Sequence, residues 1–378
     1  MQNLSYWEKT HFLKADVVII GAGIVGLNAA IALKKDNTTL SVLVLERGFL
    51  PSGASTKNAG FACFGSISEL IEQEKLSGTE ALKQLVAKRW KGLLKLRELL
   101  GDDQIDFQNH GGYELFRANE QGLANQFLNK LAYFNDLLAD VVGQKNVYTE
   151  SSSKINDFGF KGISTLLKNS LEAQIDPGLM MKTLLAKAGS FGVLVLNNCS
   201  VNQIIEEENN ISLNTNQGHF KCKKVLITTN AFVKELLPDI AVKPGRGQVI
   251  VTKPIANLKI KGTFHYDKGY YYFRNIDNRV LLGGGRNLDF KTEETTAFGE
   301  TELVQNELKT LLSQVILPNT PFEIEHKWSG IMAFGPQLAP IIEEVKPSVF
   351  CAVRCNGMGI AIGAHTGQDA AEMIYKQL

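Results

Sequence analysis

The sequence predicts a two-domain α/β fold, in which a mostly parallel sheet with helices is interrupted by an inserted domain built on an antiparallel sheet. Three observations predict it. Residues 15–46 contain a β-branched run, a glycine-rich turn, an apolar helical stretch and a second apolar run. Strand and helix patterns of the same kind return after residue 171. In contrast, residues 243–325 show the alternating runs that are typical of an antiparallel sheet. The fold class is therefore α/β and Rossmann-like, with an inserted α+β domain.

Composition excludes several classes of protein. The chain has 378 residues and is 44% hydrophobic, which is enough for two domain cores. Lys+Arg at 40 nearly cancels Asp+Glu at 39, so no net field would attract nucleic acid. Apolar runs are too short to span a bilayer, and residues 1–14 lack the apolar segment of a secretory signal. We therefore expect a cytoplasmic protein with no transmembrane segment and no nucleic-acid partner.

The five cysteines predict neither a disulfide framework nor a metal site. Their number is odd, and they are scattered over the chain. Cys351 and Cys355 lie close together, but no second pair stands elsewhere at zinc-binding spacing. We expect buried thiols in a reducing compartment, and no metal.

The first strand–turn–helix unit carries a dinucleotide-binding pattern. Gly21 permits a tight turn, Gly23 lets a pyrophosphate approach the backbone, and Gly26 lets the helix pack on the strand. Phosphate oxygens would then meet the free N–H groups of a helix that begins near Ile24. The next apolar run ends in Glu46, at the distance where such folds place the acid that binds ribose hydroxyls. A tight turn without a ligand is the alternative, but the complete unit favours a dinucleotide.

A long loop of small residues follows this unit. Residues 47–62 are rich in Gly, Ala and Ser, where a nicotinamide dehydrogenase would normally continue into another strand–helix unit. Such a loop suggests backbone that lies against an extended ligand. An ordinary surface loop is the alternative, favoured by Pro51 and Gly53.

The middle of the chain lacks nucleotide signals. The spacing of apolar residues predicts helices over 66–100 and 118–138, and a strand–turn–strand unit over 106–116 with His110 at its bend. Further along, Asp176 and a following proline predict a helix start. Strands then follow up to residues 225–231, and the small polar end of the last strand predicts a ligand at the carboxyl edge of the sheet.

The inserted sheet offers candidate substrate contacts. In residues 270–274, Tyr270, Tyr272 and Arg274 share one face of a strand, while Tyr271 and Phe273 share the other. Because one face points to a ligand, these residues cannot all contact it. Arg274, Arg246 and Arg286 are candidates to bind a substrate carboxylate, with a solvated surface position as the alternative for each.

These motifs together resemble the flavoprotein family of D-amino acid oxidase, glycine oxidase and sarcosine oxidase. The resemblance covers nearly the whole chain, and its tyrosine strand with the following Gly-Gly-Gly is similar in particular to the γ-glutamylputrescine oxidase branch. The matching segments are residues 21–26 (GAGIVG), 45–48 (LERG), 53–60 (GASTKNAG), 175–177 (IDP), 229–231 (TNA), 270–274 (YYYFR), 283–286 (GGGR) and 357–360 (GMGI).

The resemblance implies an FAD-binding domain made of residues 1–75, 168–243 and 333–378, and a substrate domain made of residues 76–167 and 244–332. It implies noncovalent FAD, because Lys57 and Asn58 occupy the loop where some members carry a flavin-linking histidine. The FAD contacts that it implies, together with the turn glycines, are Gly21, Gly23, Ile24, Val25, Gly26, Glu46, Arg47, Ser52, Ala54, Ser55, Asn58, Ala59, Gly60, Phe61, Val201, Thr229, Asn230, Gly330, Asn356, Gly357, Met358, Gly359 and Ile360.

For the substrate, the resemblance selects Tyr271 as a contact. The glycine oxidase branch carries a carboxylate-binding arginine at a position that falls near Ile331 or Met332 here. This departure favours a larger or less acidic amine over a small α-amino acid. The predicted catalytic set is Tyr271, Arg274, Arg286 and Met332.

The implied activity is oxidation of a C–N bond in an amine or amino acid. A hydride would pass to flavin N5 and leave an imine, and the flavin would be reoxidised by oxygen or another acceptor. An NAD-dependent dehydrogenase and a non-catalytic flavin-binding subunit are the alternatives.

Overall fold

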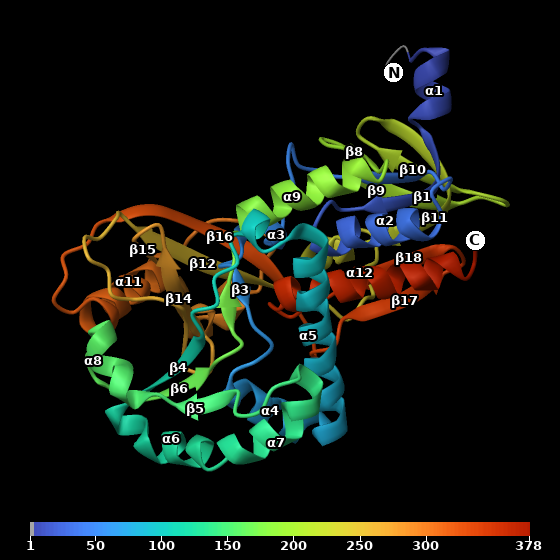
Figure 1. Ribbon diagram of the computed structural model, residues 1–378. Coiled ribbons are helices and arrows are strands. Elements are labelled where there is room, and N and C mark those ends of the chain that lie inside the picture. Colours follow the sequence, from blue (N-terminus) through green and yellow to red (C-terminus); the bar gives the residue numbers. More distant parts are fainter. Residues whose placement is uncertain (1–3) are drawn as a thin grey trace.

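The computed structural model describes residues 4–378 and contains two large sheets (Figure 1). The first sheet is mainly parallel and carries helices, and the second is mainly antiparallel, so the predicted α/β class with an antiparallel insertion is confirmed. Both sheets have eight strands. Helix α1 (Tyr6–His11) projects from the body of the first domain.

The first sheet has the order β17-β18-β11-β1-β2-β8, and a hairpin of β9 and β10 continues from β11. β1 runs parallel to both β2 and β11, as the sequence pattern predicts for a dinucleotide-binding unit. Its strands are β1 (Lys14–Ile20), β2 (Val42–Leu45), β8 (Leu194–Leu196), β9 (Val201–Glu206), β10 (Ile211–Thr215), β11 (Gly218–Ile227), β17 (Ile341–Lys346) and β18 (Val349–Val353).

The β-branched run of β1 is buried on both faces. Val17 and Ile19 pack in one core beneath the helices, and Val18 and Ile20 pack in a second core on the opposite face. This division follows from the alternation of side chains along a strand. The helices of the first core are α2 (Ile24–Asp36), α9 (Pro177–Ser190) and α12 (Gly359–Tyr375), with part of α5 (Thr79–Leu100).

The second sheet has the order β16-β12-β15-β14-β13-β4-β6-β5. One face packs on α11 (Glu302–Leu311) through an aromatic and aliphatic core, and the other face looks toward the first domain. Its strands are β4 (Gly112–Arg117), β5 (Tyr148–Glu150), β6 (Ile163–Asn169), β12 (Lys243–Thr252), β13 (Thr263–Tyr266), β14 (Tyr271–Ile276), β15 (Arg279–Gly284) and β16 (Ile324–Phe334).

Three predicted elements differ from the structure. The helix expected over 66–100 is divided into α4 (Ile67–Ser77) and α5 by Gly78, which has a φ of 82°. The helix expected over 118–138 is divided into α6 (Gln121–Leu128) and α7 (Leu131–Val142). The prediction of a strand–turn–strand unit over 106–116 was wrong. In its first half only Gln108 forms an isolated bridge, with Gln174, and no hairpin is present there.

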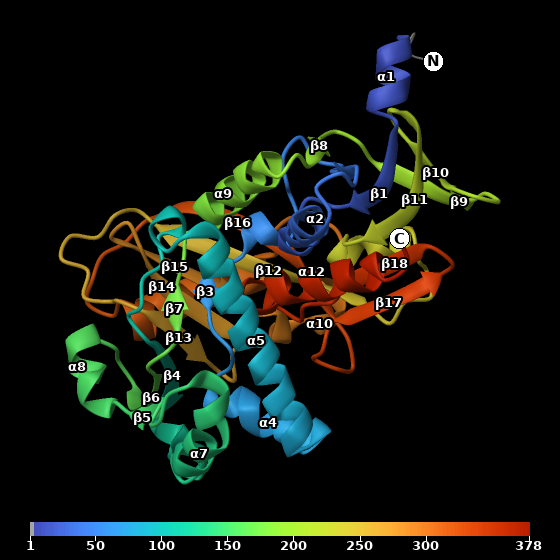
Figure 2. The ribbon, with the colours of Figure 1, turned by 45° about the vertical axis from the view of Figure 1, so that its right-hand side comes forward.

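Helix α5 joins the two regions of the molecule. Its C-terminal half packs with α2 and α12 through Leu93 and Leu96, and its N-terminal half packs with α4 through Leu82 and Val86 (Figure 2). The exact boundaries of the two domains stay a prediction. The shorter elements include α3 (Ala54–Lys57), β3 (Phe61–Ala62), α8 (Ile155–Phe158), β7 (Ala173–Gln174), α10 (Phe290–Glu293), and the 3₁₀ helices η4 (Asn230–Glu235) and η5 (Arg286–Leu288).

Across residues 4–378, we find no helix with the length and apolar character needed to cross a membrane.

Candidate active site

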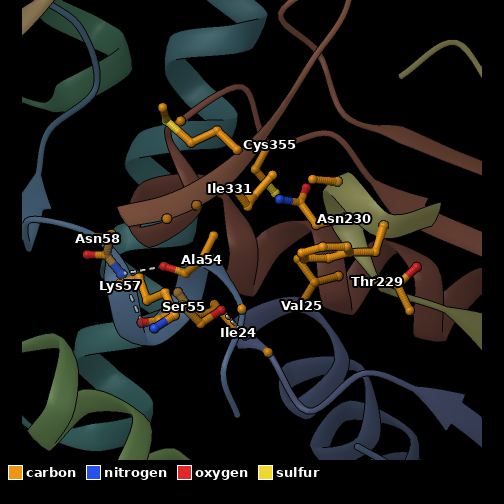
Figure 3. Close-up of a pocket in the computed structure, with 18 of the residues that line it drawn as sticks. Ile24, Val25, Ala54, Ser55, Lys57, Asn58, Thr229, Asn230, Ile331 and Cys355 are labelled. Atoms are coloured by element: carbon orange, nitrogen blue, oxygen red, sulfur yellow. Dashed lines mark hydrogen bonds between the residues drawn. The ribbon is translucent and has the colours of Figure 1, made fainter. Parts of the chain in front are cut away.

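A cavity of about 570 Å³ lies between the two sheets, within the size range of ligand sites. On the side of the first domain it is lined at the carboxyl ends of β1, β2 and β11, where open α/β sheets bind ligands. On the other side it is lined by the inner face of the second sheet. Figure 3 shows residues of α2 (Ile24 and Val25), of α3 (Ala54, Ser55 and Lys57) and of β16 (Ile331) around this space.

The turn between β1 and α2 has little room for side chains. Gly21 has a φ of +107°, which favours glycine. A Cβ added to Gly26 would lie 2.1 Å from the carbonyl oxygen of Gly21 and 2.6 Å from Oγ1 of Thr228. Gly26 therefore sits behind the cavity and permits close packing, while Gly21 and Gly23 line it. The Ile24 N–H donates to Oγ of Ser55 at 3.0 Å, so a hydroxyl already meets the helix N-terminus (Figure 3).

The carboxylate of Glu46 is buried beside this turn. Its Oε2 accepts a hydrogen bond from the Ala22 N–H at 3.0 Å, and its Oε1 accepts one from the Gly48 N–H at 2.8 Å. An ionised carboxylate has about four lone-pair positions, so two remain for a ligand. Because Glu46 lines the cavity, those positions suit ribose hydroxyls.

The loop of small residues is ordered against the cavity rather than spread on the surface. Nδ2 of Asn58 donates to the carbonyl oxygens of Ala54 and Ser55, and Oδ1 of Asn58 accepts from the Gly60 N–H (Figure 3). The indole N–H of Trp328 donates to the Lys57 carbonyl oxygen at 3.0 Å. The loop is thereby held between the two domains.

Arg274 supports this loop and does not reach the cavity. Its Nη1 donates to the Ile175 carbonyl oxygen at 2.7 Å and to the Gly60 carbonyl oxygen at 3.4 Å. The side chain is buried, and burial lowers the pKa of Arg274 to about 10. The candidate role of Arg274 in binding a substrate carboxylate is therefore corrected, because its guanidinium is committed to backbone carbonyls.

Arg246 is also corrected as a carboxylate ligand. Its Nε and Nη2 donate to the two carboxylate oxygens of Glu293 at 2.7 and 3.0 Å, in a buried pair away from the cavity. The carboxylate that Arg246 was expected to bind on a substrate is thus supplied by Glu293 of the protein itself.

Arg286 is the arginine of the three that lines the cavity. Its guanidinium carbon lies 4.0 Å from the ring centre of Phe334 and 5.0 Å from that of Phe290. Within residues 4–378 it forms no ion pair with a carboxylate. Burial lowers the pKa of Arg286 from its ordinary value. An arginine side chain is a cation at neutral pH. The site therefore holds a positive charge beside two aromatic rings.

The tyrosine strand β14 turns toward the cavity the face that carries Tyr272, not the face of Tyr271 that the resemblance selected. Tyr272 and Tyr270 line the cavity, whereas Tyr271 is buried in the core beneath the sheet and tilts against Tyr266. The alternation along β14 agrees with the sequence, but the choice of Tyr271 as a substrate contact is corrected. Burial raises the pKa of Tyr272 to about 12, so its phenol stays protonated at neutral pH.

The turn between β18 and α12 closes the far end of the cavity. Asn356 and Gly357 have positive φ values of 48° and 79°, and the N-terminus of α12 follows directly. The remaining predicted residues that line the cavity are Val25, Arg47, Ser52, Ala54, Ser55, Asn58, Ala59, Phe61, Val201, Thr229, Asn230, Gly330, Met332, Asn356, Gly357, Met358, Gly359 and Ile360. Gly60, like Gly26, lies behind the lining.

The sequence did not reveal several lining residues. Phe232 stacks on the guanidinium of Arg47 at 3.7 Å, and His265, Cys63 and Lys268 also face the cavity. Phe232, His265 and Lys268 belong to segments remote in sequence from the glycine motif, and Cys63 directly follows the loop of small residues. No local sequence pattern marks such positions as cavity residues. For His265, the alternation of side chains along its strand was the one available signal that it could face a ligand.

A glycine turn beside a buried carboxylate, at the carboxyl edge of a parallel sheet, is the arrangement of a dinucleotide-binding protein. The glycine turn, the Glu46 carboxylate and the N-terminus of α12 lie along one continuous cavity, which fits the extended shape of FAD. Comparison with known proteins identifies the family: residues 16–373 match the family described as FAD dependent oxidoreductase. The chain belongs to this family.

Individual relatives are distant in sequence. The chain is 23% identical to the "Probable oxidoreductase OrdL" of Haemophilus influenzae over 405 residues, covering 99% of this chain and 86% of that protein. It is 24% identical to an N-methyl-L-tryptophan oxidase of Escherichia coli over 301 residues, covering 76% of this chain and 75% of that protein.

Solved structures share the fold. A glycine oxidase from Geobacillus kaustophilus superposes with a TM-score of 0.75 at 19% identity, covering 96% of this chain and 95% of that chain. An L-proline dehydrogenase from P. horikoshii gives a TM-score of 0.75 at 20% identity, covering 96% of this chain and 94% of that chain.

Proposed function

We propose that this protein oxidises the C–N bond of an amine or amino acid with FAD as its cofactor, and that it releases an imine. The observation that carries the proposal is the single cavity that joins the dinucleotide turn to the inner face of the second sheet. A substrate on that sheet would lie directly beside the far end of the cofactor. The names of the relatives support the class of substrate, since they include an N-methyltryptophan oxidase, a glycine oxidase and a proline dehydrogenase.

The residues of the first domain suit FAD. The β1–α2 turn would hold the pyrophosphate, Glu46 would bind ribose hydroxyls, and the N-terminus of α12 would face the flavin. When bound, FAD supplies the acceptor for the hydride that leaves the substrate carbon.

We propose that the FAD is held without a covalent bond. Three thiols line the cavity, those of Cys63, Cys199 and Cys355. Burial raises the pKa of the Cys355 thiol to about 12 and raises the pKa of Cys199 above its ordinary value. Burial together with the charge of Glu172 raises the pKa of Cys63 well above its ordinary value. Since the thiolate is the nucleophile, none of the three cysteines is activated to attach a flavin.

We propose that Arg286 binds a carboxylate of the substrate. Its planar guanidinium lies against Phe334 and Phe290, and its donors have no hydrogen-bond partner within residues 4–378, so they are free for bidentate pairing. The side chain of Arg286 projects from η5, and its guanidinium lies over the ring of Phe334 on β16. Phe334 is two residues after Met332 in the sequence. A Cβ on Gly245 would lie 2.6 Å from Cε2 of Phe334, so this glycine leaves room for the ring against which the guanidinium lies. Arg286 thus provides a cation near the position where the β16 arginine is missing, and it makes a carboxylate-bearing substrate plausible again.

The other cavity residues orient the substrate and exclude water. Tyr272 and Phe61 form an aromatic wall with ring centres 5.8 Å apart. Because the phenol of Tyr272 stays protonated, it would position the substrate rather than remove a proton. Location in the cytoplasm, and oxygen or another molecule as the final electron acceptor, are part of the same proposal.

The experiment is an anaerobic screen of amines and D- and L-amino acids against the purified yellow protein. Bleaching of the flavin absorbance by a member of the screen would support the proposal. A colourless protein that binds NAD would favour the dehydrogenase alternative. A yellow protein that no amine bleaches would favour the non-catalytic flavin-binding alternative.

A further inference from the structure

We propose that His265, oriented by Glu172, accepts the proton that the substrate ammonium must lose before its carbon can release a hydride. The inference rests on the proposed amine oxidation and adds an acid–base residue to it. His265 lines the substrate side of the cavity, beside Phe61 and Tyr272.

The pair has the geometry of an oriented base. Nε2 of His265 lies 2.6 Å from Oε1 of Glu172, and the Glu172 side chain is 1% exposed. The same oxygen accepts a hydrogen bond from the Thr263 hydroxyl at 2.8 Å, so the carboxylate is fixed. With its Nε2 hydrogen directed to Glu172, neutral His265 carries its lone pair on Nδ1. Nδ1 has no hydrogen-bond partner among residues 4–378, which leaves it free for a ligand in the cavity.

The backbone of the sheet also supports this position. His265 on β13 is directly opposite Tyr272 on β14 and Glu114 on β4, so the three side chains share the inner face. A Cβ on Gly112 would lie 2.2 Å from the carboxyl carbon of Glu172, and glycine therefore makes room for the orienting acid.

The charged neighbours of His265 are mostly acidic. Glu172, Glu114 and Glu69 surround it, and Glu69 is paired with Arg89 at 2.7 Å. Burial lowers the pKa of His265, but the charge and hydrogen bond of Glu172, together with the charges of Glu114 and Glu69, outweigh burial, so the pKa is raised above its ordinary value. The imidazolium that would form on proton transfer is therefore stabilised, and neutral His265 is available at pH values above that raised pKa.

The proton transfer is balanced within the substrate and the protein. One N–H bond of the ammonium breaks, its electron pair stays on the amine nitrogen, and an N–H bond forms at Nδ1 of His265. The lone pair of the neutral amine can then support departure of the hydride from the adjacent carbon. An aliphatic ammonium has a pKa of about 10.4, so at pH 7 fewer than roughly one molecule in a thousand is already neutral.

The test compares the pH dependence of anaerobic flavin reduction in the wild-type protein and in His265→Asn, using the best amine of the screen. In the wild type, kcat/KM should rise through the pKa of His265 and level off. In His265→Asn it should be about 100-fold lower at pH 7 and should rise steadily toward the pKa of the amine. The loss should shrink to less than about threefold near pH 10, where the amine is already neutral in solution.

Two further variants separate a base from a structural residue. Free imidazole should restore part of the activity of His265→Ala at pH 7. Glu172→Gln should move the acid limb of the profile to lower pH, because the cause of the raised pKa is removed. His110→Asn is the matched control, since the His110 side chain is exposed and does not line the cavity, and its profile should match the wild type.

An equal loss at every pH without rescue by imidazole would overturn the proposal. The three donor atoms of Cys63, Glu172 and His265 lie within 4.8 Å of one another, so a metal ion is the competing occupant. One equivalent of metal in the purified protein, lost in Cys63→Ser, would also overturn it. If no amine bleaches the wild-type flavin, the proposed function fails as well; bleaching with a profile independent of His265 refutes this inference alone.

Discussion

Glu46→Gln tests two roles of one carboxylate, which are binding of the FAD ribose and stabilisation of the fold. In the native protein each carboxylate oxygen accepts one backbone N–H, from Ala22 and from Gly48. A glutamine keeps the shape but replaces one acceptor oxygen by an NH₂ group. The buried N–H of Ala22 or the half-buried N–H of Gly48 therefore loses its partner, whichever way the amide is turned.

The magnitude follows from these two bonds. A hydrogen bond to a charged group contributes about 1.5–3 kcal/mol, and a buried donor without a partner costs about 1–3 kcal/mol. We expect the free energy of unfolding of the FAD-free Glu46→Gln protein to fall by about 1–3 kcal/mol. Glu46→Ala removes both acceptors, so its loss should be larger.

FAD binding should weaken in addition. The ribose hydroxyls would lose a charged acceptor, and at least a tenfold rise in Kd corresponds to about 1.4 kcal/mol. The two effects are separated by measuring denaturant unfolding of the FAD-free protein and by titrating that protein with FAD, following flavin fluorescence.

The control is Glu207→Gln, which removes a partly exposed ion pair with Lys221 on the surface. It should change the free energy of unfolding by less than about 1 kcal/mol and leave FAD affinity unchanged. Normal FAD affinity in both Glu46 variants would refute the assignment of the ribose to this carboxylate. Unchanged stability of the FAD-free variants would refute its structural role.

Four further outcomes are expected. Gly26→Ala should lower the free energy of unfolding by about 1–3 kcal/mol and weaken FAD retention. Gly189→Ala, where an added Cβ meets open space, should do neither. Equal stability of the two variants would contradict the packing argument. Arg286→Leu should raise the KM of a carboxylate-bearing substrate at least tenfold, with partial recovery in Arg286→Lys, and an unchanged KM would exclude Arg286 as the anion site. Tyr272→Phe should lower kcat/KM about tenfold with FAD still bound, while Tyr271→Phe should leave it unchanged; the reverse order would restore Tyr271 to the site. Acid precipitation should release the yellow chromophore into solution, and colour in the pellet would show a covalent flavin.

The sequence alone was sufficient for the features that depend on local geometry. The β1–α2 turn needs glycine within six consecutive residues, because backbone conformation and close packing act over that distance. The buried run of β1 and the acid at the end of β2 are likewise recognised from hydrophobic pattern and spacing. These features led to the fold class, which the similar solved structures bear out, and to FAD, which the family match supports.

Only the tertiary structure decided which side chains reach the substrate side. The alternation of Tyr271 and Tyr272 was readable, but the face that meets the cavity depends on where α11 and the first domain pack against the sheet. From the sequence, Arg246, Arg274 and Arg286 were equal candidates to bind a substrate carboxylate. The structure separates them, because Arg246 pairs with Glu293 and Arg274 donates to backbone carbonyl oxygens.

The pairing of His265 with Glu172 shows the physical reason. These residues are separated by 93 positions, and their contact exists because β13 and the segment before β7 meet across the fold. Secondary-structure patterns record the surroundings of a residue within a few positions along the chain. Charge neutralisation, burial and the freedom of one ring nitrogen are set by neighbours that packing brings from elsewhere, so they are properties of the folded protein.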